Sequence, residues 1–296
     1  MKDSFLIYGA VIGDVVGSAY EFSRSEKDKA PSRVAKLNLQ DRNYTDDTVR
    51  TRAVLYSLEE KEDPAVSRRY FGKYYPPKKG GFGSMFSSWL SDSSKGPYHS
   101  FGNGAGRRIS PVAYFASSLK ECDDKAKEIT SLTHDHIEGI KAGCIIADLT
   151  YLALKGYSKE ERKKLALAYY PECLSFDLED LHQHYVHTEK ARDSVPQALF
   201  CFFATDSFLS CLQAVCYIGG DADTIGARSM AIASAYYRSI PDLWINFVSS
   251  LLPTEFNALL QKKPCPIEAK HSHPLKEEEI KSLTSYQRRN KAQADC

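Results

Sequence analysis

The chain has 296 residues, of which 43% are hydrophobic and 26% are charged, and its formal net charge is +1. Such a composition is typical of a water-soluble globular protein with a substantial core, built as one large domain or two small ones. The near-neutral balance excludes binding of a polyanion through bulk charge, and no stretch reaches the roughly 18 apolar residues that a membrane span needs. We therefore expect no membrane partner, and a nucleic-acid partner only through a local basic patch.

The eight cysteines form no C-x-x-C pair and no Cys/His cluster at zinc-finger spacing. Several lie in apolar helical runs, where cysteine behaves as a small buried hydrophobic residue: Cys144, Cys201, Cys211 and Cys216. This usage predicts free thiols and a cytoplasmic location, because disulfide frameworks belong to oxidising compartments.

Residues 5–19 predict a first helix that is rich in small residues. Asp14 interrupts its apolar run and no clean cleavage site follows, so we interpret it as a buried helix and not as a signal peptide. Each glycine in it costs about 1 kcal/mol of helix stability relative to alanine, which close packing against another helix or against a ligand would explain. Glu21 lies just past this helix, and on its own it is typical of a solvated helix end.

A T-D-D-T motif at residues 45–48 stands at the start of a helix predicted over 45–60. Thr45, Asp46 and Asp47 offer the oxygen ligands that hard divalent cations prefer. The same residue types are also common helix caps, because their oxygens accept backbone N–H groups and acids suit the helix dipole. Taken alone, one such cluster favours the cap.

A glycine-rich loop, S-F-G-N-G-A-G-R-R, lies over residues 100–108. The backbone N–H groups around Asn103 can face an anion, which makes a phosphate-binding loop one interpretation. A simple turn is the other, and a lone loop of this kind favours it.

Helices are also predicted over 111–120, 122–132 and 137–156. A T-H-D-H motif containing His134 precedes the last of them, and its two histidines could ligate a metal or cap the helix; their spacing favours the cap. Residues 171–192 predict an irregular segment whose histidines lie on the surface.

The second acidic cluster, G-G-D-A-D-T over residues 219–224, opens a small-residue-rich helix predicted over 222–238. Its glycines let the backbone approach a ligand, and Asp221, Asp223 and Thr224 add carboxylates and a hydroxyl. Adjacent carboxylates repel each other unless a cation lies between them. We therefore expect the two acidic helix starts to meet in space and to hold a two-metal site.

No alternating run of β-branched residues demands a strand, so the sequence predicts an all-α fold. We expect a compact globule of orthogonally packed helices with a binuclear metal site in a cleft. Residues 1–264 would form this domain, and residues 265–296 would form a polar C-terminal extension with one peripheral helix over 275–290. We expect the protein to be a monomer.

Taken in order, these stretches resemble the ADP-ribosylglycohydrolase family, and most of all its bacterial branch. The similarity runs from about residue 5 to about residue 240. Each stretch is weak alone, and the signal is their order: G-A-V-I-G-D-V-V-G-S-A-Y-E, Y-T-D-D-T, S-F-G-N-G-A-G-R-R-I-S-P-V, T-H-D-H-I-E-G-I-K-A-G, S-V-P-Q-A-L and G-G-D-A-D-T-I-G-A.

The resemblance implies an all-helical fold with two Mg²⁺ ions, or Mn²⁺, at the mouth of a cleft. It implies metal ligands at both helix starts: Thr45, Asp46, Asp47, Asp221, Asp223 and Thr224. It also implies a catalytic carboxylate, for which the candidates are Glu21, Asp46, Asp47 and Asp223. Contacts to the diphosphate and distal ribose of ADP-ribose would come from the loop and the middle helices: Gly102, Asn103, Gly104, Arg108 and His134.

The implied reaction is hydrolysis of the glycosidic bond between ADP-ribose and an acceptor, with release of ADP-ribose. The preferred acceptor is an arginine side chain of an ADP-ribosylated protein. The alternatives left open are a non-catalytic ADP-ribose-binding protein, a hydrolase of ADP-ribosylated nucleic acid or small molecules, another two-metal hydrolase, and helix caps that hold no metal.

The chain departs from the family pattern beside these residues. Similar proteins usually have G-N-G-S-A-M-R, whereas here Arg107 takes the place of the methionine and Arg108 keeps the arginine. Arg50 and Arg52 occupy positions that are usually apolar or small. None of these changes removes an implied metal ligand, and the added charge of Arg107 would tighten binding of the diphosphate or alter the substrate's exit path.

Overall fold

The computed structural model of the chain describes residues 6–22, 42–261 and 273–289. Within these ranges the chain forms helices and isolated β-bridges but no strand, which confirms the all-α prediction. Short 3₁₀ turns lie at Asn103–Ala105, Pro171–Leu174 and Ala191–Asp193. The α-helices, in chain order, are α1 (Tyr8–Gly17), α3 (Asp46–Glu59), α4 (Pro64–Tyr74), α5 (Ser84–Ser91), α6 (Val112–Phe115), α7 (Leu119–Ser131), α8 (Ile137–Leu154), α9 (Lys159–Tyr169), α10 (Leu178–His184), α11 (Val195–Phe203), α12 (Phe208–Ile218), α13 (Ala222–Tyr237), α14 (Asp242–Leu251), α15 (Thr254–Gln261) and α16 (Glu277–Arg289).

Two of the predicted segments differ from the observed ones. The helix predicted over 111–120 is wrong, because α6 ends at Phe115 and Ser118 caps a new helix, α7. The irregular segment predicted over 171–192 is also wrong, because Asp177 caps α10 within it. Both errors involve helices or helix starts that are set by a cap, which a search for apolar periodicity does not detect in short segments.

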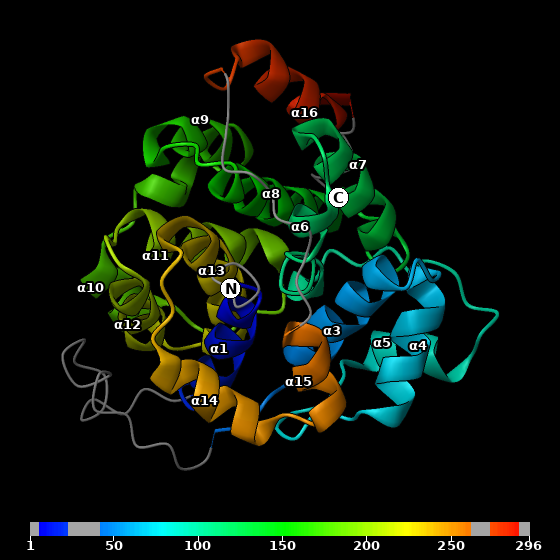
Figure 1. The fold of residues 1–296 in the computed structure, drawn as a ribbon. Helices are drawn as coiled ribbons and strands as arrows, with labels where there is room; N and C mark the ends of the chain where they lie inside the picture. The colour runs from blue at the N-terminus through cyan, green and yellow to red at the C-terminus, as the bar shows by residue number, and fades with distance from the viewer. Residues whose placement is uncertain (1–5, 23–41, 262–272, 290–296) are drawn as a thin grey trace.

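Helices α1 and α13 lie against each other at the centre of the fold, with their backbones in direct contact (Figure 1). A Cβ atom at Gly13 would lie 2.1 Å from the carbonyl oxygen of Gly226, and one at Gly226 would lie 2.3 Å from that of Gly13. A Cβ atom at Gly17 would lie 2.2 Å from the carbonyl oxygen of Ala222. The small residues of the first helix therefore serve close packing against another helix.

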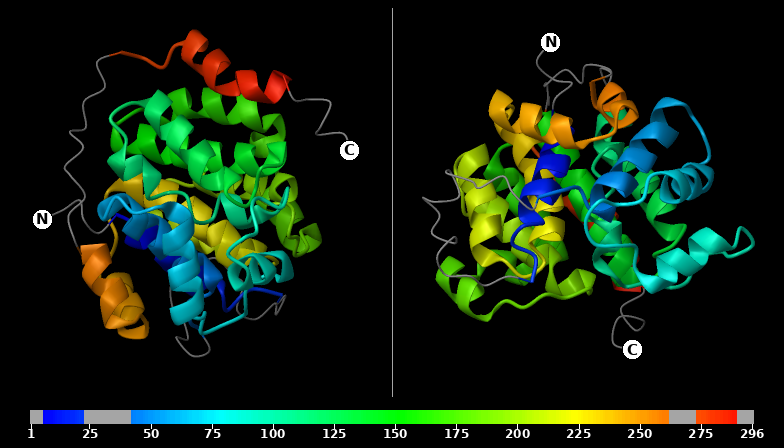
Figure 2. Two further views of the ribbon diagram at one scale, coloured as in Figure 1. Left: turned by 90° about the vertical axis from the view of Figure 1, so that its right-hand side faces the viewer. Right: turned by 90° about the horizontal axis from the view of Figure 1, so that it is seen from below.

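Helix α8 is buried along almost its whole length, between α7, α9 and α13. Figure 2 shows α7, α8 and α9, in green, packed on α13, in yellow. Helix α16 lies outside them, against α9. No helix in the described ranges is long and apolar enough to cross a membrane. The cysteines of the described chain are buried and free, as the sequence predicts for four of them: Cys122, Cys144, Cys173, Cys201, Cys211 and Cys216.

A carboxyl group is buried in α8 beside a thiol and a second carboxylate. Asp148 is fully buried, and neither of its carboxylate oxygens accepts a hydrogen bond of ordinary geometry from the described residues. Burial raises the pKa of Asp148 well above its usual range, the carboxylate of Asp123 raises it further, and the thiol of Cys122 offsets part of the shift. The folded protein therefore holds a proton on Asp148 at a pH where the unfolded chain has released it.

Gly13→Val should lower the free energy of unfolding by about 3 kcal/mol, because the new side chain meets the backbone of α13, which cannot rotate away. Chemical denaturation measures this loss. Gly96→Val is the matched control: no described heavy atom lies within 4 Å of a Cβ there, and we expect a change below about 1 kcal/mol. Equal losses in the two variants would contradict the close helix contact.

Asp148→Asn should become more stabilising, relative to wild type, as the pH rises. The raised pKa of the folded state makes wild-type stability fall as the pH increases above about 4, where the unfolded chain ionises, and the amide removes this term. Urea denaturation at about pH 5 and about pH 8 should show the difference growing by up to about 1.4 kcal/mol per pH unit. Asp242→Asn, at an exposed carboxylate of α14, is the control, and a pH-independent difference for Asp148→Asn would refute the assignment.

Candidate metal centre

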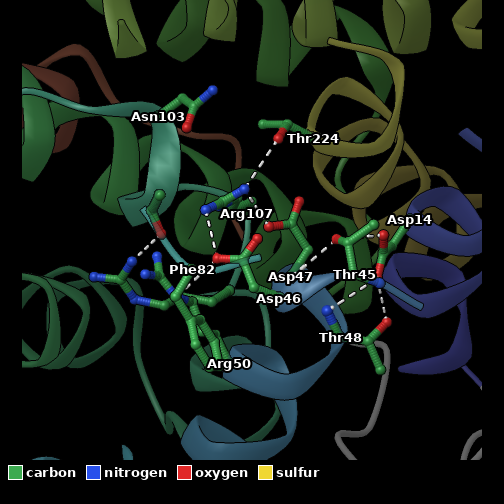
Figure 3. A network of polar contacts seen from close by, with 12 residues as sticks. Asp14, Thr45, Asp46, Asp47, Thr48, Arg50, Phe82, Asn103, Arg107 and Thr224 are labelled. Atoms are coloured by element: carbon green, nitrogen blue, oxygen red, sulfur yellow. Dashed lines mark hydrogen bonds and ion pairs between the residues drawn. The ribbon is translucent and has the colours of Figure 1, made fainter. Parts of the chain in front are cut away.

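Asp14 of α1 ties the start of α3 to the central helix pair. Its carboxylate accepts hydrogen bonds from the hydroxyl and the backbone N–H of both Thr45 and Thr48, the two N–H groups at 3.1 and 3.0 Å. Thr45 in turn caps α3, since its hydroxyl oxygen accepts the backbone N–H of Asp47 at 3.2 Å. The cap therefore exists, and it places Asp46 and Asp47 on the first turn of the helix (Figure 3).

The second acidic cluster reaches the same place through two glycines. Gly219 and Gly220 have φ angles of 70° and 65°, a conformation that residues with a side chain rarely adopt. A Cβ atom at Gly220 would also lie 2.7 Å from the ring of Tyr185. The carbonyl of Gly220 accepts the backbone N–H of Phe22 at 3.0 Å, which ties the segment after α1 to the acidic start of α13.

Carboxylates from three helices converge at this point. One oxygen from each of Asp14, Asp47 and Asp223 lies within 4.8 Å of the others, and all three side chains are buried. Oδ2 of Asp47 and Oδ1 of Asp223 have no hydrogen-bond donor among the described residues. Oxygens bound to one divalent ion at about 2.1–2.4 Å lie within about 4–5 Å of one another. The two helix starts thus meet, and their unpartnered carboxylate oxygens fit a divalent cation.

Burial makes this cluster hard to ionise without a cation. It raises the pKa of Asp14 to about 6, although four hydrogen bonds oppose the shift. It also raises the pKa values of Asp47 and Asp223 well above their usual range; Arg107 opposes the shift at Asp47, and the carboxylate of Asp221 adds to it at Asp223. A cation beside these groups stabilises their charged forms.

A guanidinium group lies against one side of the cluster (Figure 3). Arg107 donates from Nη2 to Asp46 Oδ2 at 2.8 Å and from Nη1 to the hydroxyl of Thr224 at 3.4 Å, and Nη1 lies 2.6 Å from Asp47 Oδ1. Nε of Arg50 lies 3.1 Å from the same oxygen of Asp46. Burial opposes the charge of Arg107, but the surrounding carboxylates outweigh it and raise its pKa, so this arginine is charged.

A cleft of about 500 Å³ opens beside the cluster, a volume typical of small-molecule sites. Predicted site residues from both helix starts and from the glycine-rich loop line it: Glu21, Thr45, Asp46, Gly102, Asn103, Gly104, His134, Asp221 and Asp223. Asp47 and Thr224 are fully buried and are not part of this lining.

The first backbone N–H groups of the glycine-rich loop donate hydrogen bonds to other groups of the protein. The backbone N–H of Gly102 donates to the hydroxyl of Ser100 at 3.1 Å, and that of Asn103 donates to the carbonyl of Glu189 at 2.7 Å. The side-chain amide of Asn103 donates to Asp221 Oδ2, also at 2.7 Å. Of the two interpretations that the sequence leaves open, the anion-facing loop does not hold for these two N–H groups, and the amide of Asn103 contacts the second acidic cluster instead.

Arg108 supports the loop from behind. Its guanidinium group is buried and donates to the carbonyl of Gly104 and, at 2.9 Å, to the hydroxyl of Thr133. His134 lies beside it, with Nε2 close to Gly104, and burial together with the charge of Arg108 lowers the pKa of His134 well below its usual range. Of the two adjacent arginines, Arg107 lines the cleft and Arg108 does not.

Glu21 lines the cleft from the segment after α1, where it forms an isolated bridge with Gly220. Burial raises the pKa of Glu21 to about 7; the carboxylate of Asp221 adds to the shift and Lys79 opposes it. Glu21 is therefore not the solvated helix end that its position in the sequence suggests.

The structure brings residues to the site that the sequence did not place there. Asp14 gave a signal, because an acid inside a buried small-residue helix needs polar partners. The sequence already placed the charge of Arg107 near the diphosphate and marked Arg50 as a charge at a position that is usually apolar or small in similar proteins, but it did not indicate that both arginines contact Asp46. His187, one of the histidines of residues 171–192 that the sequence places on the surface, has a side chain that is 28% exposed, and it lines the cleft with Nε2 3.7 Å from Asp221 Oδ1.

Comparison with known proteins gives a consistent set of relatives. The family model described as ADP-ribosylglycohydrolase matches residues 6–263. The chain is similar to ADP-ribosylhydrolase ARH3 of Mus musculus, at 26% identity over 80% of this chain and 84% of that protein. It is also similar to ADP-ribosylarginine hydrolase Tri1 of Pseudomonas putida (strain GB-1), at 23% identity over 82% of this chain and 73% of that protein. A solved structure of an ADP-ribosylglycohydrolase-related protein complex shares the fold, with a TM-score of 0.62 and 23% identity over 87% of this chain and 95% of that chain.

Asp14→Ala should lower the free energy of unfolding in EDTA by about 3 kcal/mol or more, because it leaves the buried donors of Thr45 and Thr48 without an acceptor. Urea denaturation measures the loss. Asp177→Ala is the matched control: Asp177 caps α10 at the surface, and its loss should cost about 1 kcal/mol. Similar losses in both variants would show that Asp14 is no more than an ordinary cap.

Proposed function

Because the chain belongs to the ADP-ribosylglycohydrolase family, we propose that it is a metal-dependent hydrolase that cleaves the glycosidic bond between ADP-ribose and its acceptor. The observation that carries this proposal is the buried cluster of Asp14, Asp47 and Asp223 beside the cleft, in which Asp47 Oδ2 and Asp223 Oδ1 have no donor among the described residues and suit Mg²⁺ or Mn²⁺. The family resemblance implies ligands at the two helix starts, of which Asp47 and Asp223 belong to this cluster: Thr45, Asp46, Asp47, Asp221, Asp223 and Thr224.

Bound divalent cations would supply Lewis-acid stabilisation of the charge that develops at the ribose and at the attacking water. The protein's own groups have to hold the substrate and accept a proton. The cleft wall formed by Gly102, Gly104 and His134 would hold the ADP-ribose chain against the acidic cluster. The neutral ring of His134 suits this task, because its Nε2 faces the cleft side of the loop without adding charge.

We assign the general base to Glu21. Among the candidate carboxylates, Asp46 is held by arginine contacts and Asp47 is paired with Arg107. Asp223 belongs to the buried cluster that suits the cation. Glu21 lines the cleft outside that cluster, so its carboxylate would take the proton of the water that attacks the glycosidic carbon.

We propose an ADP-ribosylated arginine side chain of a protein as the acceptor. One relative of this chain bears the name ADP-ribosylarginine hydrolase. The cleft offers a physical reason as well, because a guanidinium acceptor is cationic and Glu189, a carboxylate outside the proposed ligand set, also lines the cleft and would be available to pair with it. A serine-linked or nucleic-acid-linked acceptor would gain no such attraction.

The proposal predicts release of free ADP-ribose from arginine-linked substrate with Mg²⁺, and its loss in EDTA. A panel of arginine-, serine- and nucleic-acid-linked ADP-ribose, followed by chromatography of the product, measures both. Asp223→Ala should lower the rate at least about a hundredfold by removing a metal ligand, and Glu21→Gln should lower it by about the same factor by removing the base. Asp124→Ala, at an exposed carboxylate, is the control and should act as wild type does.

Each part of the proposal has its own contrary outcome. Near-native activity of Asp223→Ala would refute the metal ligand, and an unchanged rate in Glu21→Gln would remove Glu21 from the chemistry. Release from the serine- or nucleic-acid-linked substrate alone would refute the arginine acceptor. No release from any of the three, together with calorimetric binding of ADP-ribose, would identify a binding protein instead of a hydrolase.

A further inference from the structure

We infer that Arg107 takes the place of one of the two divalent ions that the sequence pattern predicts, so that this protein binds a single ion per chain. This assignment rests on the proposed metal dependence, but it concerns the number and affinity of ions and not the reaction. It would make the glycine-rich loop, which carries Arg107, a part of the metal centre.

The contacts of Arg107 span both acidic helix starts. From α3 it contacts Asp46 Oδ2 with Nη2 at 2.8 Å and Asp47 Oδ1 with Nη1 at 2.6 Å. From α13 it reaches the hydroxyl of Thr224 with Nη1 at 3.4 Å. An ion that joined Asp47 to Thr224 would need these same oxygens at about 2.1 Å, and would therefore compete for the position that Nη1 holds.

The guanidinium group of Arg107 is largely buried and is held in place by its neighbours. The side chain of Arg107 is 13% exposed, and those of Asp46 and Asp47 are 6% and 0% exposed, so solvent screens their attraction little. Its backbone is also held, because the carbonyl of Arg107 accepts the hydroxyl of Thr51 on α3 at 3.3 Å. The loop thus presents a fixed positive charge to the carboxylates.

One ion position remains beside the arginine. Asp47 Oδ2 and Asp223 Oδ1 are buried and have no hydrogen-bond donor among the described residues, and the three-carboxylate cluster with Asp14 has the spacing of one ion. These oxygens are the part of the predicted ligand set that Arg107 leaves without a cation. A single Mg²⁺ or Mn²⁺ would fill it.

Arg50 does not have the same role, although it also contacts Asp46. Its Nε lies 3.1 Å from Asp46 Oδ2, while its guanidinium carbon lies 3.7 Å from the ring centroid of Phe86, so the group stacks on the cleft wall. No contact from Arg50 to Asp47 or Thr224 is seen in the described structure. Arg50 is therefore the matched comparison for Arg107, with the same charge and the same carboxylate but a different position.

The test counts ions in the absence of substrate. Isothermal titration of the full-length, EDTA-stripped protein with Mn²⁺ should give one ion per chain for wild type. Arg107→Met should give two ions per chain and bind the tighter one at least about tenfold more strongly, because a positive charge has left the site. Arg107→Lys, which keeps the charge, and Arg50→Met should each give one ion per chain.

Thermal unfolding gives a second readout that does not depend on turnover. Arg107→Met should have a lower melting temperature than wild type in EDTA, because Asp46 and Asp47 lose the guanidinium group that they contact. On addition of saturating Mn²⁺ its midpoint should rise by about 2–4 °C more than that of wild type. If Arg107→Met does not fold, Arg107→Gln, which is neutral but retains a hydrogen-bonding amide, serves for the same comparison.

Two ions in wild type, at the affinity found for Arg107→Met, would overturn the inference by showing that Arg107 swings aside. The release assay on the same samples separates this result from failure of the proposed function. Release of ADP-ribose with equal ion numbers in wild type and variant would leave the function standing and the inference refuted. A change in ion number without release would support the inference and refute the function, and absence of Mn²⁺ binding by all folded variants would refute both.

Discussion

The direct contact between the backbones of α1 and α13, at Gly13 and Gly226, is the constraint on which the site depends. Because no side chain separates the two helices, Asp14 of α1 comes close enough to share a cluster with Asp223 of α13. Asp14 then accepts the first N–H groups of α3 and fixes a third helix to the pair. A wider contact would move these carboxylates apart, so the loss of helix propensity at the glycines is the cost of bringing three helix segments to one point.

The carboxylates that converge at this point repel one another, and other groups of the site compensate part of their charge. Burial raises the pKa values of Asp47 and Asp223, which means that the ionised cluster is unstable without compensating charge. The glycine-rich loop supplies such charge through Arg107. It also supplies a donor through Asn103, whose amide N–H lies 2.7 Å from the carboxylate of Asp221. The oxygens that remain unpartnered mark the place where the chain alone does not complete the compensation.

Much of this arrangement could be predicted from the sequence, and the failures have physical causes. The all-α fold and the meeting of the T-D-D-T and D-A-D-T helix starts follow from apolar periodicity and from the repulsion of paired acids. The short helix α10 could not be found that way, because a cap at Asp177 and not a long apolar face defines it. The roles of Arg107 and Arg108 could not be separated either, since adjacent residues on a tight turn point in different directions that no spacing rule specifies.

The positions of these two arginines link the cleft wall to the acidic cluster. Arg108 holds the loop through the carbonyl of Gly104, and Arg107, the next residue back, contacts the carboxylates of α3. A displacement of the loop would therefore move the cleft wall and the guanidinium group together, and it would alter the charge beside Asp47. In this chain the surface that we assign to ADP-ribose and the charge that we infer to limit cation binding belong to one structural element. An exchange of Arg107 for an uncharged residue would separate these two properties, whereas in the present sequence they change together.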